Sequence, residues 1–196
     1  MPSLHLAIAK AAEPALATAI ANVDPSSPLG PTLPHLRVLH ATVLTRLNRP
    51  DAFDEFNKLI VSDWPHLRGL TPQSFYDALA EHEVARRAFR EFVRGHIDDP
   101  SLLYAAARIW ESVGYQHNDA ELRREALATW TELVAHAPSE PQAWFGKAEA
   151  QHQLGDLDGA VKSYERSLEL WPEFLGASAR LKIVKAELDA MRRRGR

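Results

Sequence analysis

This sequence contains no cysteine among its 196 residues, which excludes disulfide bonds, thiolate metal sites and a cysteine nucleophile. It also has no run approaching the ~20 consecutive apolar residues of a membrane-spanning helix, so we expect no membrane partner. The first residues lack the positive segment of a signal peptide, and His5, Lys10 and Glu13 interrupt their apolar pattern. We therefore expect a cytoplasmic protein.

The chain also lacks a large excess of positive or negative charge, and it lacks the common catalytic motifs. The net charge is −3 and the isoelectric point is about 6.3, so no basic field attracts nucleic acid. The sequence has no glycine-rich phosphate loop, no HExxH and no GxSxG. The nine histidines are scattered. We expect no enzyme, no cofactor, no metal site and no nucleic-acid partner.

What the chain does have is a repeated pair, an alanine followed four residues later by an aromatic. Residues four apart lie one above the other on a helix face, so a small residue admits a neighbouring helix and the aromatic fills the adjacent space. Successive alanines are 36, 38 and 34 residues apart, a period typical of helical repeat arrays. The pairs are Ala52/Phe56, Ala88/Phe92, Ala126/Trp130 and Ala160/Tyr164.

The unit 141–174 carries the fullest pattern. Its patterned residues are Trp144, Ala148, Gly155, Ala160, Tyr164, Leu168 and Pro172. In these positions the unit resembles the tetratricopeptide repeat family, whose repeats are antiparallel helix pairs stacked into a superhelix. The resemblance predicts helices over 141–153 and 157–170, with Gly155 supplying a left-handed turn residue.

Residues 33–140 resemble the family more loosely. The stretch 69–102 has no turn signal between its two expected helices, and a single helix from Pro72 to about His96 is an alternative to a hairpin. The stretch 101–140 fits with about seven extra residues in the turn at 115–121. We therefore predict an all-α, tetratricopeptide-like solenoid of about four helix-pair repeats.

Two flanks complete the predicted organisation. The stretch Leu175–Arg194 has an apolar stripe and a polar back, as expected of a helix that caps a terminal repeat. Residues 1–23 form an apolar helical arm interrupted by Pro14, and 24–34 read as a proline-rich linker ahead of a repeat domain over 35–194. The arm either folds back onto the array or docks on a second protomer, which would make a homodimer.

The family resemblance also implies a binding site. In tetratricopeptide arrays the first helix of each pair lines a concave groove, and its non-core positions contact a bound segment. Carried over position by position, the partner-binding residues are Arg37, Gln73, Asp77, Tyr104, Arg108, Glu111, Phe145, Glu149, His152 and Gln153. Tyr104 and Phe145 are expected to face solvent without a packing role. The groove asparagines of chaperone-tail clamps are absent, which argues against that specificity.

The leading hypothesis is a non-enzymatic, chaperone-like scaffold or adaptor that binds a protein or peptide in the groove. One alternative is an accessory subunit or small enzyme using the groove histidines and carboxylates. Another is self-association through the N-terminal arm. The stripe Arg86, Arg90 and Arg94 is read first as a solvated helix face and second as a contact for an anionic partner.

Overall fold

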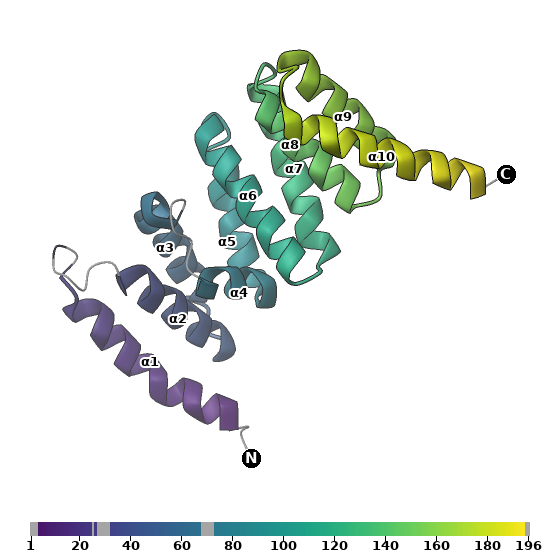
Figure 1. The fold of residues 1–196 in the computed structure, drawn as a ribbon. Coiled ribbons are helices and arrows are strands. Elements are labelled where there is room, and N and C mark those ends of the chain that lie inside the picture. The colour runs from purple at the N-terminus through teal and green to yellow at the C-terminus, as the bar shows by residue number, and fades with distance from the viewer. Residues whose placement is uncertain (1–3, 25, 27–31, 68–72, 195–196) are drawn as a thin grey trace. The chain divides into compact units, whose positions relative to one another are not determined.

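The chain is helical wherever its structure is described. The computed structural model describes residues 4–24, 26, 32–67 and 73–194, and within them ten α-helices and no strand are present (Figure 1). Their bounds are α1 Leu4–Asn22, α2 Leu33–Arg46, α3 Ala52–Leu67, α4 Gln73–Glu81, α5 Glu83–Arg94, α6 Pro100–Gln116, α7 Ala120–His136, α8 Pro141–Gln153, α9 Leu157–Leu170 and α10 Leu175–Arg194. The proline-rich stretch 24–34 lies largely outside the described residues.

The helices form two compact units, Met1–Gly95 and His96–Arg196. In the first unit α1 packs against α2, α2 against α3, and α3 against α5, while α4 contacts α2 and α5. In the second unit each helix from α6 to α10 packs against the next. Both units therefore have the helix-after-helix packing of an α-solenoid, and the predicted all-α architecture is confirmed.

The last repeat has the predicted helix bounds. Helices α8 and α9 begin and end at the expected residues, and Gly155 between them has φ +81°, the left-handed conformation that glycine adopts at little cost. Helix α10 also has the bounds expected of the capping helix. Local sequence signals are sufficient here because caps, turn glycine and apolar spacing all agree.

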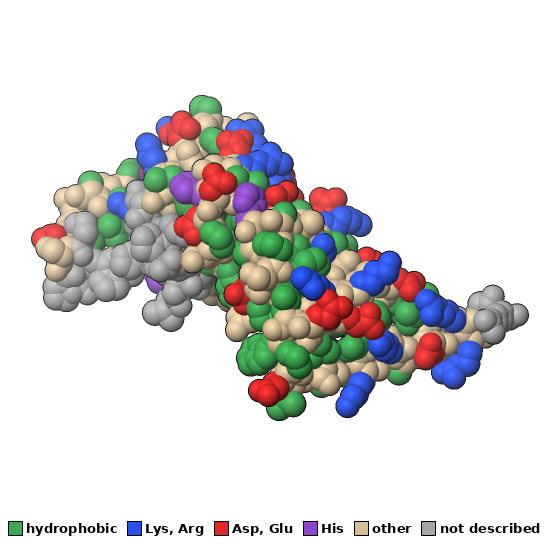
Figure 2. Space-filling model, turned by 90° about the horizontal axis from the view of Figure 1, so that it is seen from above, with side chains coloured by type: hydrophobic (Ala, Val, Ile, Leu, Met, Phe, Trp, Pro, Cys, Tyr) green, Lys and Arg blue, Asp and Glu red, His purple; other side chains and the backbone are tan. Residues whose placement is uncertain are grey.

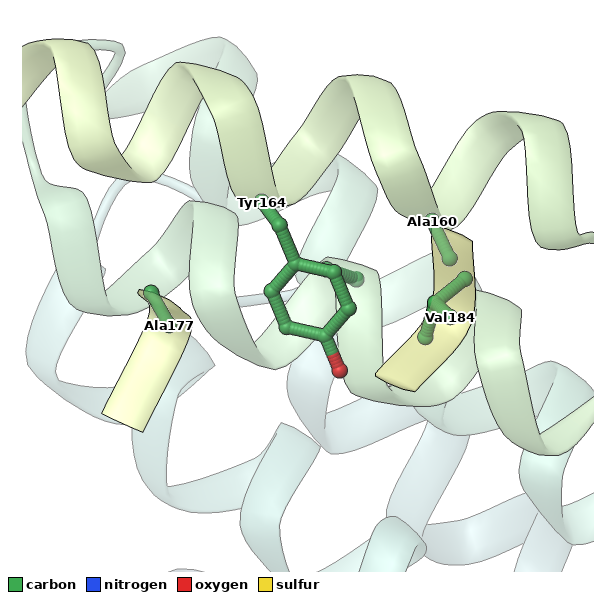
Figure 3. Close-up of a cluster of buried hydrophobic side chains, with 5 residues drawn as sticks. Ala160, Tyr164, Ala177 and Val184 are labelled. Carbon is green, nitrogen blue, oxygen red and sulfur yellow. The ribbon is translucent and has the colours of Figure 1, made fainter. Parts of the chain in front are cut away.

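All four alanine–aromatic pairs are buried, with 6% exposure or less for each residue. In the last pair the Tyr164 ring projects from α9 between Ala177 and Val184 of α10, and Ala160 lies one turn before it (Figure 3). The small residue and the aromatic thus have the packing roles that their spacing predicts.

A break at His82 excludes the single helix considered for residues 72–96. His82 is extended, with φ −125° and ψ 113°, and separates α4 from α5 without a glycine or proline. The guanidinium of Arg86 donates to the carbonyl oxygens of Leu79 and Ala80, at 3.2 and 3.0 Å. These bonds satisfy carbonyl groups that the end of α4 leaves without helical partners. The break therefore depends on a side chain from the following helix.

The extra residues expected in a turn at 115–121 lengthen the helices instead. Both α6 and α7 have 17 residues, and only 117–119 lie between them. Gly114 lies at the close approach, because a Cβ there would be 2.9 Å from the backbone nitrogen of Arg123. Helix α6 consequently presents one more turn of surface than the sequence suggested.

The N-terminal arm forms one helix, with Pro14 inside α1. It packs on α2, where Ala9 is buried, whereas Ile8, an apolar residue of the arm, is 58% exposed. His40 of α2 lies between two carboxylates, Nε2 being 3.8 Å from Glu13 and Nδ1 3.9 Å from Glu55. In this structure the arm lies on its own chain.

Candidate functional site

Helix α6 carries one line of exposed and polar side chains. The helix begins where the Asp99 carboxylate accepts hydrogen bonds from the backbone N–H groups of residues 101 and 102. Spacings of four, three and four residues then place one set of side chains along the same side of the helix. We call this set the α6 face: Tyr104, Arg108, Glu111 and Tyr115.

The two tyrosines of the α6 face are accessible, with exposures of 37% for Tyr104 and 71% for Tyr115. The Tyr104 ring is held edge-on against the buried Trp130 ring, with centroids 5.3 Å apart. Trp130 in turn lies against Gly146 of α8, where a Cβ would be only 2.5 Å from the indole carbons. Tyr104 is therefore positioned by a close-packed core contact while part of its ring remains exposed, so the expectation that it has no packing role is wrong.

An ion pair lies between the tyrosines. Arg108 donates from Nη1 to Oε2 of Glu111 at 2.6 Å, and its side chain is 60% exposed. Glu111 is buried, and this burial raises the pKa of its carboxyl group; Arg108 opposes the shift and the charge of Glu149 adds to it. Arg108 thus presents an accessible cation backed by a buried acid.

The neighbouring helix α8 contributes Glu149, which is close enough to Glu111 to influence its ionisation. Glu149 accepts a hydrogen bond from the Tyr164 hydroxyl, and its Oε1 lies 3.2 Å from Nε of Arg180. Burial, together with the bond to Glu149, raises the pKa of Tyr164 above its ordinary value, so the phenol stays protonated and donates. Glu149 is consequently engaged within its own unit.

The other α8 residues expected to contact a partner have structural roles. His152 Nε2 lies 2.8 Å from Oε2 of Glu187 in α10, and Gln153 is partly buried. Phe145 packs against the rings of Tyr164 and Phe174, with centroids 5.8 and 4.9 Å apart. The expectation that Phe145 faces solvent without a packing role is therefore wrong, because α10 and the residues before it cover this side of α8.

Three expected partner-binding residues lie in the other unit. Gln73 donates from Nε2 to Oδ1 of Asp77 at 2.9 Å, a bond between residues one turn apart on α4. Arg37 is partly buried on α2. Their role in partner binding stays a prediction.

Sequence reasoning missed two residues of the site. Tyr115 was assigned to a turn, although its spacing of eleven from Tyr104 places it on the same helix face once α6 continues to Gln116. Arg180 was regarded as part of the polar back of the capping helix, yet it bonds to Glu149 of α8. The first could have been found from periodicity, whereas the second depends on how α10 packs.

The arginine stripe of α5 makes contacts within its own unit. Arg86 and Arg90 both donate to the Glu83 carboxylate at 2.7 Å, and Arg87 stacks over the Phe53 ring at 4.2 Å. The Glu83 pKa is lowered, chiefly by the bond from Arg86. These partners give the basic side chains a structural use and weaken the case for an anionic ligand at this stripe.

Two other kinds of site receive no support in the described parts of the chain. No group of three or more His, Asp or Glu side chains is arranged to hold a metal ion there. None of the helices described is both long and apolar enough to cross a bilayer.

The chain was compared with known families and structures. Residues 119–173 match the family model described as tetratricopeptide repeat, which covers α7, α8 and α9. No curated protein matches the chain.

Three solved structures illustrate the likeness in fold. The first TPR of Spaghetti (RPAP3), bound to an HSP90 peptide, has 24% identity, covers 60% of this chain and 82% of its own, and has a TM-score of 0.45. The crystal structure of MamA is 15% identical in sequence, and the match covers 70% of this chain and 77% of MamA with a TM-score of 0.48. TTC0263 of Thermus thermophilus has 19% identity with 92% of each chain covered and a TM-score of 0.44.

Proposed function

We propose that this chain, whose residues 119–173 match the tetratricopeptide repeat family, is a non-enzymatic scaffold that binds a segment of a partner protein along the α6 face. The observation that carries the proposal is the pair of exposed tyrosines, Tyr104 and Tyr115, on either side of the accessible Arg108 guanidinium. Tyrosine and arginine are the residue types that most often dominate binding energy at protein interfaces.

The spacing of the anchors suggests the size of the bound segment. Eleven residues at 1.5 Å each separate the two tyrosine Cα atoms by about 16 Å along the helix. An extended segment of about five residues, or three turns of a helix, has the same length. We therefore propose a partner with two apolar or aromatic side chains about 16 Å apart.

Arg108 gives the segment a preferred charge. A guanidinium has five N–H donors in a planar fork, and the bond to Glu111 uses one nitrogen. The exposed remainder is suited to a carboxylate between the two apolar anchors. High salt should weaken such a contact, because exposed charge pairs are screened.

The ten expected partner-binding residues do not all have the same role in the proposed site. Tyr104 and Arg108 remain central, Tyr115 is added, and Glu111 supports Arg108. Phe145, Glu149 and His152 are assigned supporting roles because they contact residues of their own unit. Among the described residues, the groove histidine His152 contacts Glu187 of α10, so the alternative of an enzyme using the groove histidines gains no support from this contact.

A displayed library of random twelve-residue peptides can test the α6 face without knowledge of the native partner. We expect selection on the full chain to enrich acidic sequences with two apolar anchors, and Tyr104→Ala/Tyr115→Ala to weaken their binding by about 2 kcal/mol or more, a loss of roughly thirtyfold. Arg108→Ala should weaken it further at low salt.

The matched control is Arg124→Ala, since Arg124 of α7 is also an exposed arginine paired with a glutamate three residues away. It should leave binding unchanged. Melting curves of all variants must stay within a few degrees of the parent. Failure to enrich any peptide, or equal binding by the folded double-tyrosine variant, would reject the α6 face as the site.

A further inference from the structure

Helix α10 has two apolar sides, and its own unit covers only one. The inner side is buried through Ala177, Val184 and Leu188. At 100° per residue, a second line of apolar side chains lies well to one side of the first. We call it the outer stripe: Leu175, Ala179, Ile183, Ala186 and Ala190. Leu175 is 82% exposed and Ile183 46% exposed.

The contacts of α10 with its own unit leave the outer stripe unused. Three ion pairs and one histidine–carboxylate hydrogen bond join the helix to α8 and α9, at distances between 2.7 and 3.2 Å. From α10 they use Arg180, Lys185, Glu187 and Arg192. Neither these pairs nor the buried inner side accounts for a large aliphatic side chain such as Ile183 on the opposite surface.

Between Ala179 and Ala190 the order of large and small residues makes the outer stripe complementary to itself. If two copies of α10 pack antiparallel about a two-fold axis midway between residues 184 and 185, Ile183 faces Ala186 of the second copy and Ala179 faces Ala190. The Ile183 side chain of each copy then lies against a small residue of the other copy, and the two-fold axis makes the two contacts equivalent. Such a pairing of a large with a small side chain is the knobs-into-holes packing of helix pairs. The two alanine pairs permit close approach of the helices.

Charges along the two borders of the stripe select the antiparallel orientation. One border carries Lys182 and Asp189, and the other carries Arg180 and Glu187, each with the basic residue seven positions before the acidic one. Toward the C-terminal end of the molecule, the space-filling view shows basic and acidic side chains interspersed on the surface (Figure 2).

In an antiparallel pair about this axis each border runs along the same border of the second copy in reverse order, so that Lys182 lies near Asp189 of that copy. Arg180 and Glu187 run along the other border, where each also contacts α8 of its own unit. A parallel, in-register pair would instead bring Lys182 near Arg180 and Asp189 near Glu187. Like charges facing each other disfavour that arrangement.

From these observations we infer that the outer stripe of α10 is a homodimer interface, in which α10 packs antiparallel against α10 of a second copy. The interface is separate from the α6 face and does not depend on the proposed function. One helix pair buries less than a standard interface, so the dimer is a weak one that forms at micromolar concentrations.

Sedimentation equilibrium of the full chain over a concentration series tests the dimer. The parent should dimerise reversibly. Ile183→Asp should raise the dissociation constant at least about tenfold, because it puts a charge against Ala186 of the other copy. Lys182→Glu and Asp189→Lys should each weaken the dimer, while the double variant Lys182→Glu/Asp189→Lys should restore it by exchanging the two signs.

Ile8→Asp is the control, since Ile8 is an exposed isoleucine on α1, the arm that was the other candidate for self-association. It should leave the dissociation constant unchanged. A parent that stays monomeric, a dimer that survives Ile183→Asp, or a double charge exchange that fails to restore association would each overturn the proposal. Loss of the dimer through Ile8→Asp alone would transfer the interface to the arm.

Discussion

The two units differ in how their helices begin. In His96–Arg196 the helices α6, α7, α8 and α9 each start at an acidic residue whose side chain accepts backbone N–H bonds. In Met1–Gly95 the residues before α2 and α5, Thr32 and His82, make no such bond. The second unit therefore sets its helix boundaries with local signals, whereas the first relies more on tertiary contacts. The clearest repeat pattern in the sequence lies in the locally specified unit.

Removing the central aromatic of the last repeat should have the largest effect. Tyr164→Ala deletes a ring that is fully buried among α8, α9 and α10, and should cost about 3–5 kcal/mol in unfolding free energy. Tyr164→Phe keeps the ring and removes only the bond to the Glu149 carboxylate, at a smaller cost of about 1.5–3 kcal/mol. Chemical denaturation of both variants measures the difference. Equal costs would mean that packing at this position contributes little.

The break at His82 provides the next test, in the unit that lacks local caps. Arg86→Ala removes the donor to the carbonyl groups of Leu79 and Ala80 and should cost about 1.5–3 kcal/mol, the range for hydrogen bonds from a charged group. Hydrogen exchange should quicken at the end of α4. Arg94→Ala, an exposed arginine on the same helix, is the control. Unaltered exchange in α4 would show that the break does not need Arg86.

A pair of cap substitutions sharpens the contrast directly. Asp119→Ala removes an acceptor for two backbone N–H groups at the start of α7 and should cost about 1 kcal/mol. Thr32→Ala removes no capping bond, so its cost should be smaller than that of Asp119→Ala. Thermal unfolding of the two variants side by side is sufficient. Comparable losses would remove the distinction drawn between the units.

Acidification should change the stability of the two units in opposite directions, and we expect this effect to be the smallest. Burial lowers the pKa of His82 below the ordinary value of 6.5. As pH falls through 6.5, His82 therefore becomes protonated in the unfolded chain before it does in the folded chain, and the Met1–Gly95 unit loses stability. Burial raises the pKa of Glu111 above the ordinary value of 4.5. As pH falls toward 4.5, Glu111 therefore becomes protonated in the folded His96–Arg196 unit before it does in the unfolded chain, and this unit gains stability.

Variants that cannot titrate should remove each trend. His82→Gln should flatten the loss in the first unit, and Glu111→Gln should raise stability relative to the parent at pH 7 by more than at pH 4.5. Hydrogen exchange followed by segment across this pH range separates the units. A shift of the same sign in both would contradict the assigned causes.

Part of the binding site could be anticipated from periodicity, and part could not. Tyr104 and Arg108 are exposed on the helix predicted to carry them, whereas their binding role remains a prediction. Phe145 failed as an exposed anchor because its surroundings depend on Phe174 and α10, which are distant in sequence from the helix pattern that selected it. Tyr115 was missed because a family-based turn was assumed where the helix continues.

The sequence alone determined the all-α class, the repeat period, the buried alanine–aromatic pairs and the bounds of α8, α9 and α10, because each follows from local spacing, a turn glycine or a cap. Only the tertiary structure decided where α5 begins, which α8 side chains are covered, and that α10 keeps an exposed apolar side. Those features arise from contacts between helices, and the side chains that make them come from segments whose local patterns do not specify one another.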